Sequence, residues 1–144
     1  MQRFSWILFV VIGALGLLMT VAWMASPGAG LETLTAAAGM QGASFDPEQT
    51  ALVHFVIRWT ATALLGANGL TILVATGPFR RGERWAGFAL AYWPVLFVSH
   101  LAMYEAGPKS LVQVVLLVLT IGALTEFFVR TRGLTMNARS VHLT

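Results

Sequence analysis

Four long runs of apolar residues, separated by short polar segments, dominate the pattern of the chain. They cover about residues 4–24, 47–76, 84–104 and 108–130. A helix of about 20 residues, rising 1.5 Å per residue, crosses the ~30 Å hydrocarbon core of a bilayer. Backbone polar groups find no other partners in hydrocarbon, so each run is predicted to be a helix. The pattern therefore predicts an all-α fold, a four-helix transmembrane bundle.

Composition supports this class. Of the 144 residues, 57% are hydrophobic and only 10% are charged, whereas soluble domains have about 25% charged residues. So few charges cannot cover a soluble globule, and we expect a single integral membrane domain spanning residues 1–144. The chain has no cysteine, which excludes disulfides, thiolate catalysis and Cys-ligated metals. We expect no metal site.

The Lys and Arg residues predict the orientation. Residues 26–49, between the first and second runs, contain neither residue type. By the positive-inside rule, both termini and the loop between the second and third runs face the cytoplasm, in a bacterial inner membrane. The net charge of +3 then reflects topology, and we expect no nucleic-acid partner. The residues concerned are Arg3, Arg80, Arg81, Arg84, Arg130, Arg132 and Arg139.

The segment before the second run carries helix signals of its own. Asp46 suits an N-cap, Pro47 the first helical position, and Gln49 the capping-box position. The stretch LETLTAAAGM, residues 31–40, predicts a short helix in the extracytoplasmic loop. Pro94 is expected to kink the third run.

The second run places an ionisable pair in an otherwise apolar stretch. His54 and Arg58 are four residues apart, so they share one helical face. A charged Arg at mid-bilayer costs about 2.5–3.5 kcal/mol on insertion scales, which favours a partner inside the bundle. Polar residues of the third and fourth runs come to a similar depth, and we predict that they converge in an extracytoplasmic pocket. Its residues are His54, Arg58, His100, Tyr104, Glu105 and Gln113.

These residues also have a structural interpretation. His54 and His100 can bond loop carbonyls or water at the interface, and Arg58 can form an ion pair that holds the loop. Glu126 and Arg130, spaced i,i+4, are expected to form a solvated pair at the cytoplasmic end.

Small and polar residues in the second run predict helix contacts. Asn68 and Thr71 are expected to form interhelical hydrogen bonds. Thr62 and Gly66 form a small-xxx-small pair, which predicts a helix packing seam.

The stretch GPFRRGERWAGFAL, residues 77–90, follows an apolar helix that contains IRW at residues 57–59. This middle part of the chain, from about His54 to His100, resembles uncharacterised small four-helix bacterial membrane proteins. They carry a similar Arg-Arg-Gly-Glu-Arg-Trp-Ala loop between helices two and three. The resemblance implies a four-helix bundle in a bacterial inner membrane, and it implies no activity.

Three classes of function are open. The first is a non-catalytic accessory subunit of a membrane complex, or a binder of a lipophilic small molecule in the outer-leaflet pocket. The second is a b-type haem protein with His54 and His100 as axial ligands and Arg58 on a propionate. The third is an isomerase in the manner of the emopamil-binding-protein family, with Glu105 joining the two histidines in proton transfer. We favour the first because it needs no catalytic motif. The haem class lacks a clear pattern of small residues around the two histidines, and the isomerase lacks a carboxylate deep in any run. The expected partners are the lipid bilayer and either other membrane subunits or a lipophilic ligand, and the sequence assigns no cofactor.

Overall fold

The computed structural model describes residues 5–40, 42–103 and 108–141, and the side chains of residues 5–40, 42–103 and 111–132. The chain is 88% helical, and the described residues contain no strand, which confirms the all-α prediction. Four helical segments are long and apolar enough to cross a membrane. The elements are α1 (Ser5–Ala25), α2 (Pro27–Ala37), α3 (Pro47–Val74), the π-helix η1 (Ala75–Phe79), α4 (Arg84–Leu90), α5 (Tyr92–Met103) and α6 (Pro108–Val141).

The helix signals around α2 and α3 are confirmed. The Asp46 carboxylate accepts a bond from the Gln49 backbone N–H at 2.8 Å, and Gln49 Oε1 accepts from the Asp46 N–H at 3.2 Å. This capping box starts α3 at Pro47. The expected loop helix forms as α2, but it begins earlier than predicted, at Pro27. A proline is well suited to the first helical turn, because that turn's N–H groups have no intrahelical partner.

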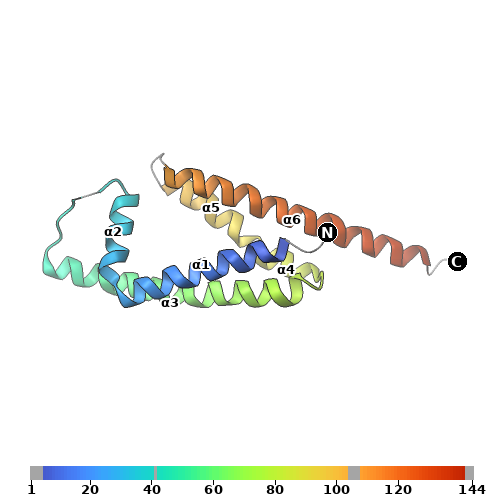
Figure 1. Cartoon of the computed structure of the whole chain (residues 1–144), viewed down its shortest axis with the longest axis horizontal. Coiled ribbons are helices and arrows are strands. Elements are labelled where there is room, and N and C mark those ends of the chain that lie inside the picture. The colour runs from blue at the N-terminus through green and yellow to red at the C-terminus, as the bar shows by residue number, and fades with distance from the viewer. Residues whose placement is uncertain (1–4, 41, 104–107, 142–144) are drawn as a thin grey trace.

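The last helix is longer than the apolar pattern predicted. We expected it to end near Arg130, and α6 continues to Val141. Hydropathy marks the part of a helix that suits hydrocarbon, whereas a helix ends where its backbone is interrupted. Residues 131–141 contain no proline to interrupt it. Figure 1 shows this end of α6 projecting beyond the other helices.

The contact between α1 and α3 uses small residues of α1. A Cβ added at Gly16 would collide with the Asn68 side chain, and one at Gly13 would lie 2.8 Å from Ile72 Cγ1. Asn68 Nδ2 donates to Thr20 Oγ1 at 3.4 Å, which confirms Asn68 as an interhelical hydrogen-bonding residue. The backbones of the two helices therefore lie close together, with the buried Asn68 amide between them.

The seam predicted at Thr62 and Gly66 is wrong as a contact within this chain. Both residues are exposed, and a Cβ at Gly66 would meet no atom within 4 Å. The spacing of small residues was correct for a seam, but the buried face of α3 is set by where α1 lies. That face carries Asn68 and Ile72 instead.

The helices α5 and α6 form a second pair. Among the described residues, it contacts the α1–α3 pair at one end only. There Phe79 of η1 stacks on Phe127 of α6, with ring centroids 4.2 Å apart, and Phe9 of α1 meets Phe79 edge-on. Gly87 of α4 lets α6 approach, because a Cβ there would lie 2.7 Å from Phe127. Away from this core the α5–α6 pair diverges from the α1–α3 pair toward α2 (Figure 1).

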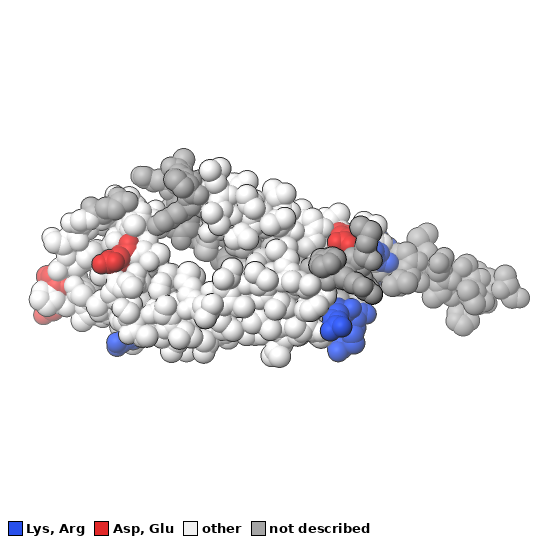
Figure 2. All heavy atoms as spheres, in the orientation of Figure 1, with Lys and Arg blue, Asp and Glu red and all other residues white. Residues whose placement is uncertain are grey.

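On the face drawn in Figure 2, the described charged side chains lie toward the two ends and none lies between them. We call the end formed by η1, the η1–α4 turn and the N-terminus of α1 the Arg-rich end, because Arg80, Arg81 and Arg84 lie there. We call the opposite end the α2 end; it includes Glu32, Asp46 and Glu48. Four apolar helices with an uncharged middle indicate an integral membrane protein.

Candidate functional site

His54 and Arg58 lie on a part of α3 that extends past α1. His54 is half-buried and Arg58 is exposed, while Ile57 between them packs against Gly30 of α2. Continued through η1, α3 has 33 residues, so it is about 20 Å longer than the hydrocarbon core. With the Arg-rich end at one membrane boundary, Arg58 comes near the opposite boundary. At that position we expect its side chain to reach water or lipid headgroups without a partner inside the bundle.

His100 and Gln113 belong to the other helix pair. His100 on α5 and Gln113 on α6 are both half-buried, and Gln113 Oε1 is buried with no hydrogen-bond partner among the described residues. Tyr104 and Glu105 lie outside the described residues.

The six residues of the predicted pocket therefore come from two helix pairs. His54 is on α3, which packs chiefly on α1, and His100 is on α5, which packs chiefly on α6. Toward the α2 end these pairs diverge (Figure 1), whereas a haem held by both histidines requires them at one iron. The convergence of these residues stays a prediction.

A groove lies between α3 and the α4–α5 segment. It measures about 230 Å³, slightly smaller than the 300–1,000 Å³ of pockets for drug-sized ligands. Thr71, which lines the groove, lies about 12 Å along the helix from Phe79. The groove is therefore within the predicted membrane span. The lining residues are Ala67, Leu70, Thr71 and Val74 of α3, Ala89 and Leu90 of α4, and Tyr92 of α5.

Two hydroxyl groups are the polar side-chain groups of this groove, and they are bonded to each other. Thr71 Oγ1 lies 2.9 Å from the Tyr92 hydroxyl and accepts a hydrogen bond from Trp93 Nε1 at 3.1 Å. Thr71 is buried, while Tyr92 keeps 37% of its surface exposed. Thr71 is thus confirmed as an interhelical hydrogen-bonding residue, and it ties α3 to the start of α5.

The groove forms where the third membrane segment breaks. Its helix is interrupted at Ala91, between α4 and α5. Pro94 has no N–H for the Leu90 carbonyl, and its ring crowds that carbonyl, so the helix cannot continue undisturbed through this turn. This interruption lies one turn before the proline, where a proline-induced kink is expected; the kink itself stays a prediction. After the interruption, α5 leaves α3 and follows α6, so the groove lies at the point of divergence (Figure 1).

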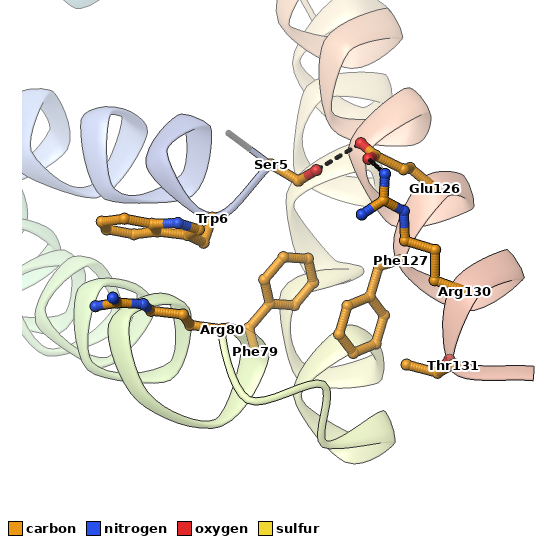
Figure 3. Close-up of a pocket in the computed structure, with 8 residues that line it drawn as sticks. All are labelled: Ser5, Trp6, Phe79, Arg80, Glu126, Phe127, Arg130 and Thr131. Carbon is orange, nitrogen blue, oxygen red and sulfur yellow. Dashed lines mark hydrogen bonds and ion pairs between the residues drawn. The ribbon is translucent and has the colours of Figure 1, made fainter. Parts of the chain in front are cut away.

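A polar cluster closes the Arg-rich end. Glu126 accepts a hydrogen bond from Ser5 Oγ at 2.6 Å and pairs with Arg130 Nη2 at 2.6 Å, so the predicted Glu126–Arg130 pair is confirmed. It is only partly exposed, and it also joins α6 to α1. On the other side of Phe79 and Phe127, the Arg80 guanidinium extends over the Trp6 ring, 5.2 Å from its centroid (Figure 3). The cavity among these residues measures about 20 Å³, room for about one water molecule.

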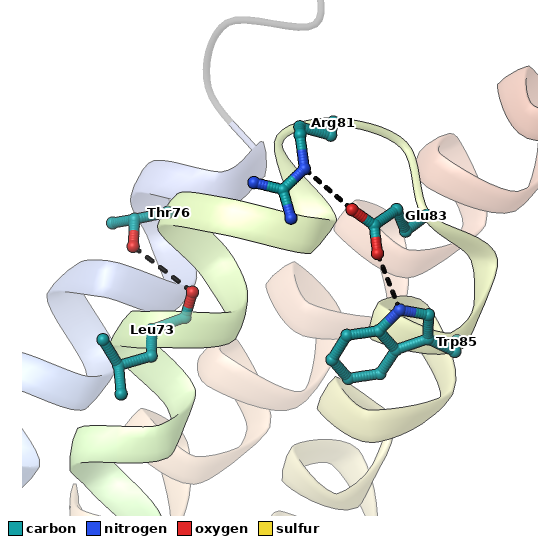
Figure 4. Close-up of polar contacts among 5 residues, drawn as sticks. All are labelled: Leu73, Thr76, Arg81, Glu83 and Trp85. Atoms are coloured by element: carbon teal, nitrogen blue, oxygen red, sulfur yellow. Dashed lines mark hydrogen bonds and ion pairs between the residues drawn. The ribbon is translucent and has the colours of Figure 1, made fainter.

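The turn between η1 and α4 is held by Glu83. Its carboxylate accepts from Arg81 Nε at 2.7 Å and from Trp85 Nε1 at 2.8 Å (Figure 4). The bonds from Arg81 and then Trp85 lower the pKa of Glu83 from its ordinary value of 4.5. Gly82, with φ of +81°, makes the turn possible, because this backbone region strains a residue with a side chain.

Sequence reasoning missed Tyr92 as a site residue. Aromatic residues near Trp93 have the composition of a membrane-interface belt, and no periodicity pairs Tyr92 with Thr71. The available signal was Pro94, which marks a broken helix, and broken helices in membranes border cavities or packed protein. Comparisons with family models, curated proteins and solved structures find no match for this chain.

Proposed function

We propose that this chain is a non-catalytic protein of a bacterial inner membrane that binds a lipophilic small molecule in the groove between α3 and the α4–α5 segment. Both termini and the Arg-rich end face the cytoplasm. The charge distribution supports this orientation, because the Arg-rich end carries the cluster Arg80, Arg81 and Arg84 and the α2 end carries Glu32, Asp46 and Glu48.

The groove is the observation that carries the proposal. Its walls are apolar except for Thr71 and Tyr92, and an apolar concavity with a few oriented polar groups is the usual form of a small-molecule site. Its depth along α3 lets a ligand enter sideways from the bilayer. A volume of about 230 Å³ suits one ring or a stretch of chain with its polar end.

Filling the groove tests this function. Ala89 is an exposed groove residue and Ala63 is an exposed residue of α3 outside the groove, so Ala89→Phe and Ala63→Phe form a matched pair. The protein is purified gently from its native membrane, and the co-purifying small molecules are identified by mass spectrometry. We expect wild type and Ala63→Phe to retain one defined lipophile and Ala89→Phe to lose it. Equal retention by both variants, or no retained molecule in wild type, contradicts the proposal.

A second candidate, an accessory subunit of a membrane complex, is favoured by α6. Its helix continues to Val141, beyond the apolar span that ends at Arg132. Short helical extensions are marginally stable alone in water, so a partner on the cytoplasmic side would stabilise this one. Truncation after Arg132 is then expected to abolish stoichiometric co-purification of other subunits while the membrane-spanning part stays folded. Unchanged co-purification contradicts this role.

A further inference from the structure

The hydrogen bonds at Thr71 determine which atoms of the groove can still donate or accept a hydrogen bond. Thr71 Oγ1 donates to the Ala67 carbonyl at 2.9 Å, the bond to residue i−4 that a helical threonine commonly makes. A hydroxyl has one proton and two lone pairs. The single proton of Thr71 is therefore used within α3, and its other neighbours must be donors.

Those two donors come from α5. Trp93 Nε1 has only a proton to give and donates to Thr71 Oγ1 at 3.1 Å. The Tyr92 hydroxyl, 2.9 Å from the same oxygen, must then donate its own proton as well. Thr71 is saturated by one donated and two accepted bonds. Tyr92, which lines the groove, keeps lone pairs on its oxygen and has no proton left for a ligand.

The Tyr92 oxygen is thus an acceptor that borders the groove. In hydrocarbon no water competes for it, so an unsatisfied donor or acceptor on a ligand is costly.

We propose that the groove selects a lipophilic alcohol, whose hydroxyl donates to Tyr92, over lipophiles whose polar end only accepts, such as ethers, esters and quinones. This inference rests on the proposed function, since it names the ligand class of the same groove. It follows from the direction of the hydrogen bonds and not from the shape of the walls.

Two photoreactive probes test it: a dodecanol that carries a diazirine on its chain, and the methyl ether of the same molecule. Both are presented to the full chain in nanodiscs of phosphatidylcholine, a lipid without a hydroxyl donor, and labelled peptides are quantified by mass spectrometry. We expect the peptides of α3 and α4–α5 to be labelled about two- to tenfold more by the alcohol, the effect of one hydrogen bond.

Three variants test whether the hydrogen bonds of Tyr92 and Thr71 cause the preference for the alcohol. Tyr92→Phe removes the acceptor oxygen, and the preference is expected to fall to one. Thr71→Val frees the Tyr92 proton, which can be donated to the oxygen of either probe, so the preference for the alcohol is expected to fall toward one. Thr71→Ser keeps the network and the preference for the alcohol. If Thr71→Val does not fold, Tyr92→Phe still decides the matter.

The outcomes for the function and for the ligand class are distinct. Equal labelling of the wild-type groove by both probes, with competition by unlabelled dodecanol, overturns the alcohol preference and leaves lipophile binding in place. A preference that survives in Tyr92→Phe also overturns it. Absence of groove labelling by either probe contradicts the proposed function itself.

Discussion

The Tyr92 hydroxyl lies 2.9 Å from Thr71 Oγ1, and this contact joins α3 to α5 at the point where the two helix pairs diverge. Trp93 of the next position reaches the same oxygen. One buried threonine thus holds both aromatic residues that follow the break in the third membrane segment. The contact has consequences for stability as well as for the groove.

Replacing Thr71 is expected to destabilise the protein. Thr71→Val leaves the buried Trp93 N–H without its acceptor, and we expect a loss of about 1–3 kcal/mol in the free energy of unfolding. Thr71→Ser retains the hydroxyl and is expected to lose less than half of that. Thermal unfolding in detergent, followed by the near-ultraviolet signal of the tryptophans, measures both. Equal melting temperatures for wild type and Thr71→Val contradict the role of this bond.

Two glycines of similar sequence context are expected to respond in opposite directions. Gly16→Ala forces the α1–α3 contact apart, because the added Cβ collides with Asn68. Gly66→Ala meets no atom within 4 Å and gains helix propensity worth up to about 1 kcal/mol. We expect the first variant to melt lower than wild type and the second to melt at the same temperature or higher. A lower melting point for Gly66→Ala alone would place the packing seam on the other face of α3.

The Glu126–Arg130 pair is expected to contribute little. Its side chains are 40% and 35% exposed, and partly exposed ion pairs are usually worth less than about 1 kcal/mol. A double-mutant cycle with Glu126→Gln and Arg130→Met measures the coupling, with Ser5→Ala as a third variant for the contact to α1. A coupling above that range would show that the cluster is screened from water more than its exposure suggests.

Stability is expected to depend on pH through Glu83. Its pKa is lowered in the folded protein by the bonds from Arg81 and Trp85, so the stabilisation is fully present above pH 4.5, the ordinary pKa. It is lost as pH falls below that value through the folded pKa. Melting temperatures measured between pH 7 and pH 3 in wild type and Glu83→Gln test this. The acid-induced decrease is expected to be smaller in the variant, and identical decreases contradict it.

Single cysteines test the orientation, since the chain has none of its own. Ala43→Cys at the α2 end is expected to react with a membrane-impermeant maleimide in intact cells. Ser140→Cys, near the end of α6, is expected to react only after the membrane is opened. The reverse pattern would invert the topology and would leave the groove and its hydrogen bonds unaffected.

Part of the groove and of the α1–α3 contact was predictable from single residues. Thr71 and Asn68 are polar residues in an apolar run, and a polar group in hydrocarbon needs a partner, so interhelical hydrogen bonds followed. Pro94 marked the break because its ring and missing N–H act on its own helix. The partners of Thr71 did not follow, because the register of α3 against α5 depends on where α5 turns away.

The packing seam shows the same limit. Spacing placed Thr62 beside Gly66 on one face of α3, but spacing does not say which face a neighbouring helix covers. In a membrane the apolar faces are equally suited to lipid, so hydrophobicity cannot choose among them. The close approach of Gly13 and Gly16 to α3 made that choice.

The sequence by itself determined that the chain is all-helical, with four segments suited to a membrane, and where α3 begins, because hydropathy, caps and prolines act within one helix. Only the tertiary structure decided which residues meet. It placed His54 and His100 on diverging helix pairs and brought Thr71 to Tyr92 and Trp93. Contacts between helices arise from packing and hydrogen bonds summed over whole faces, and no local pattern in the chain encodes that sum.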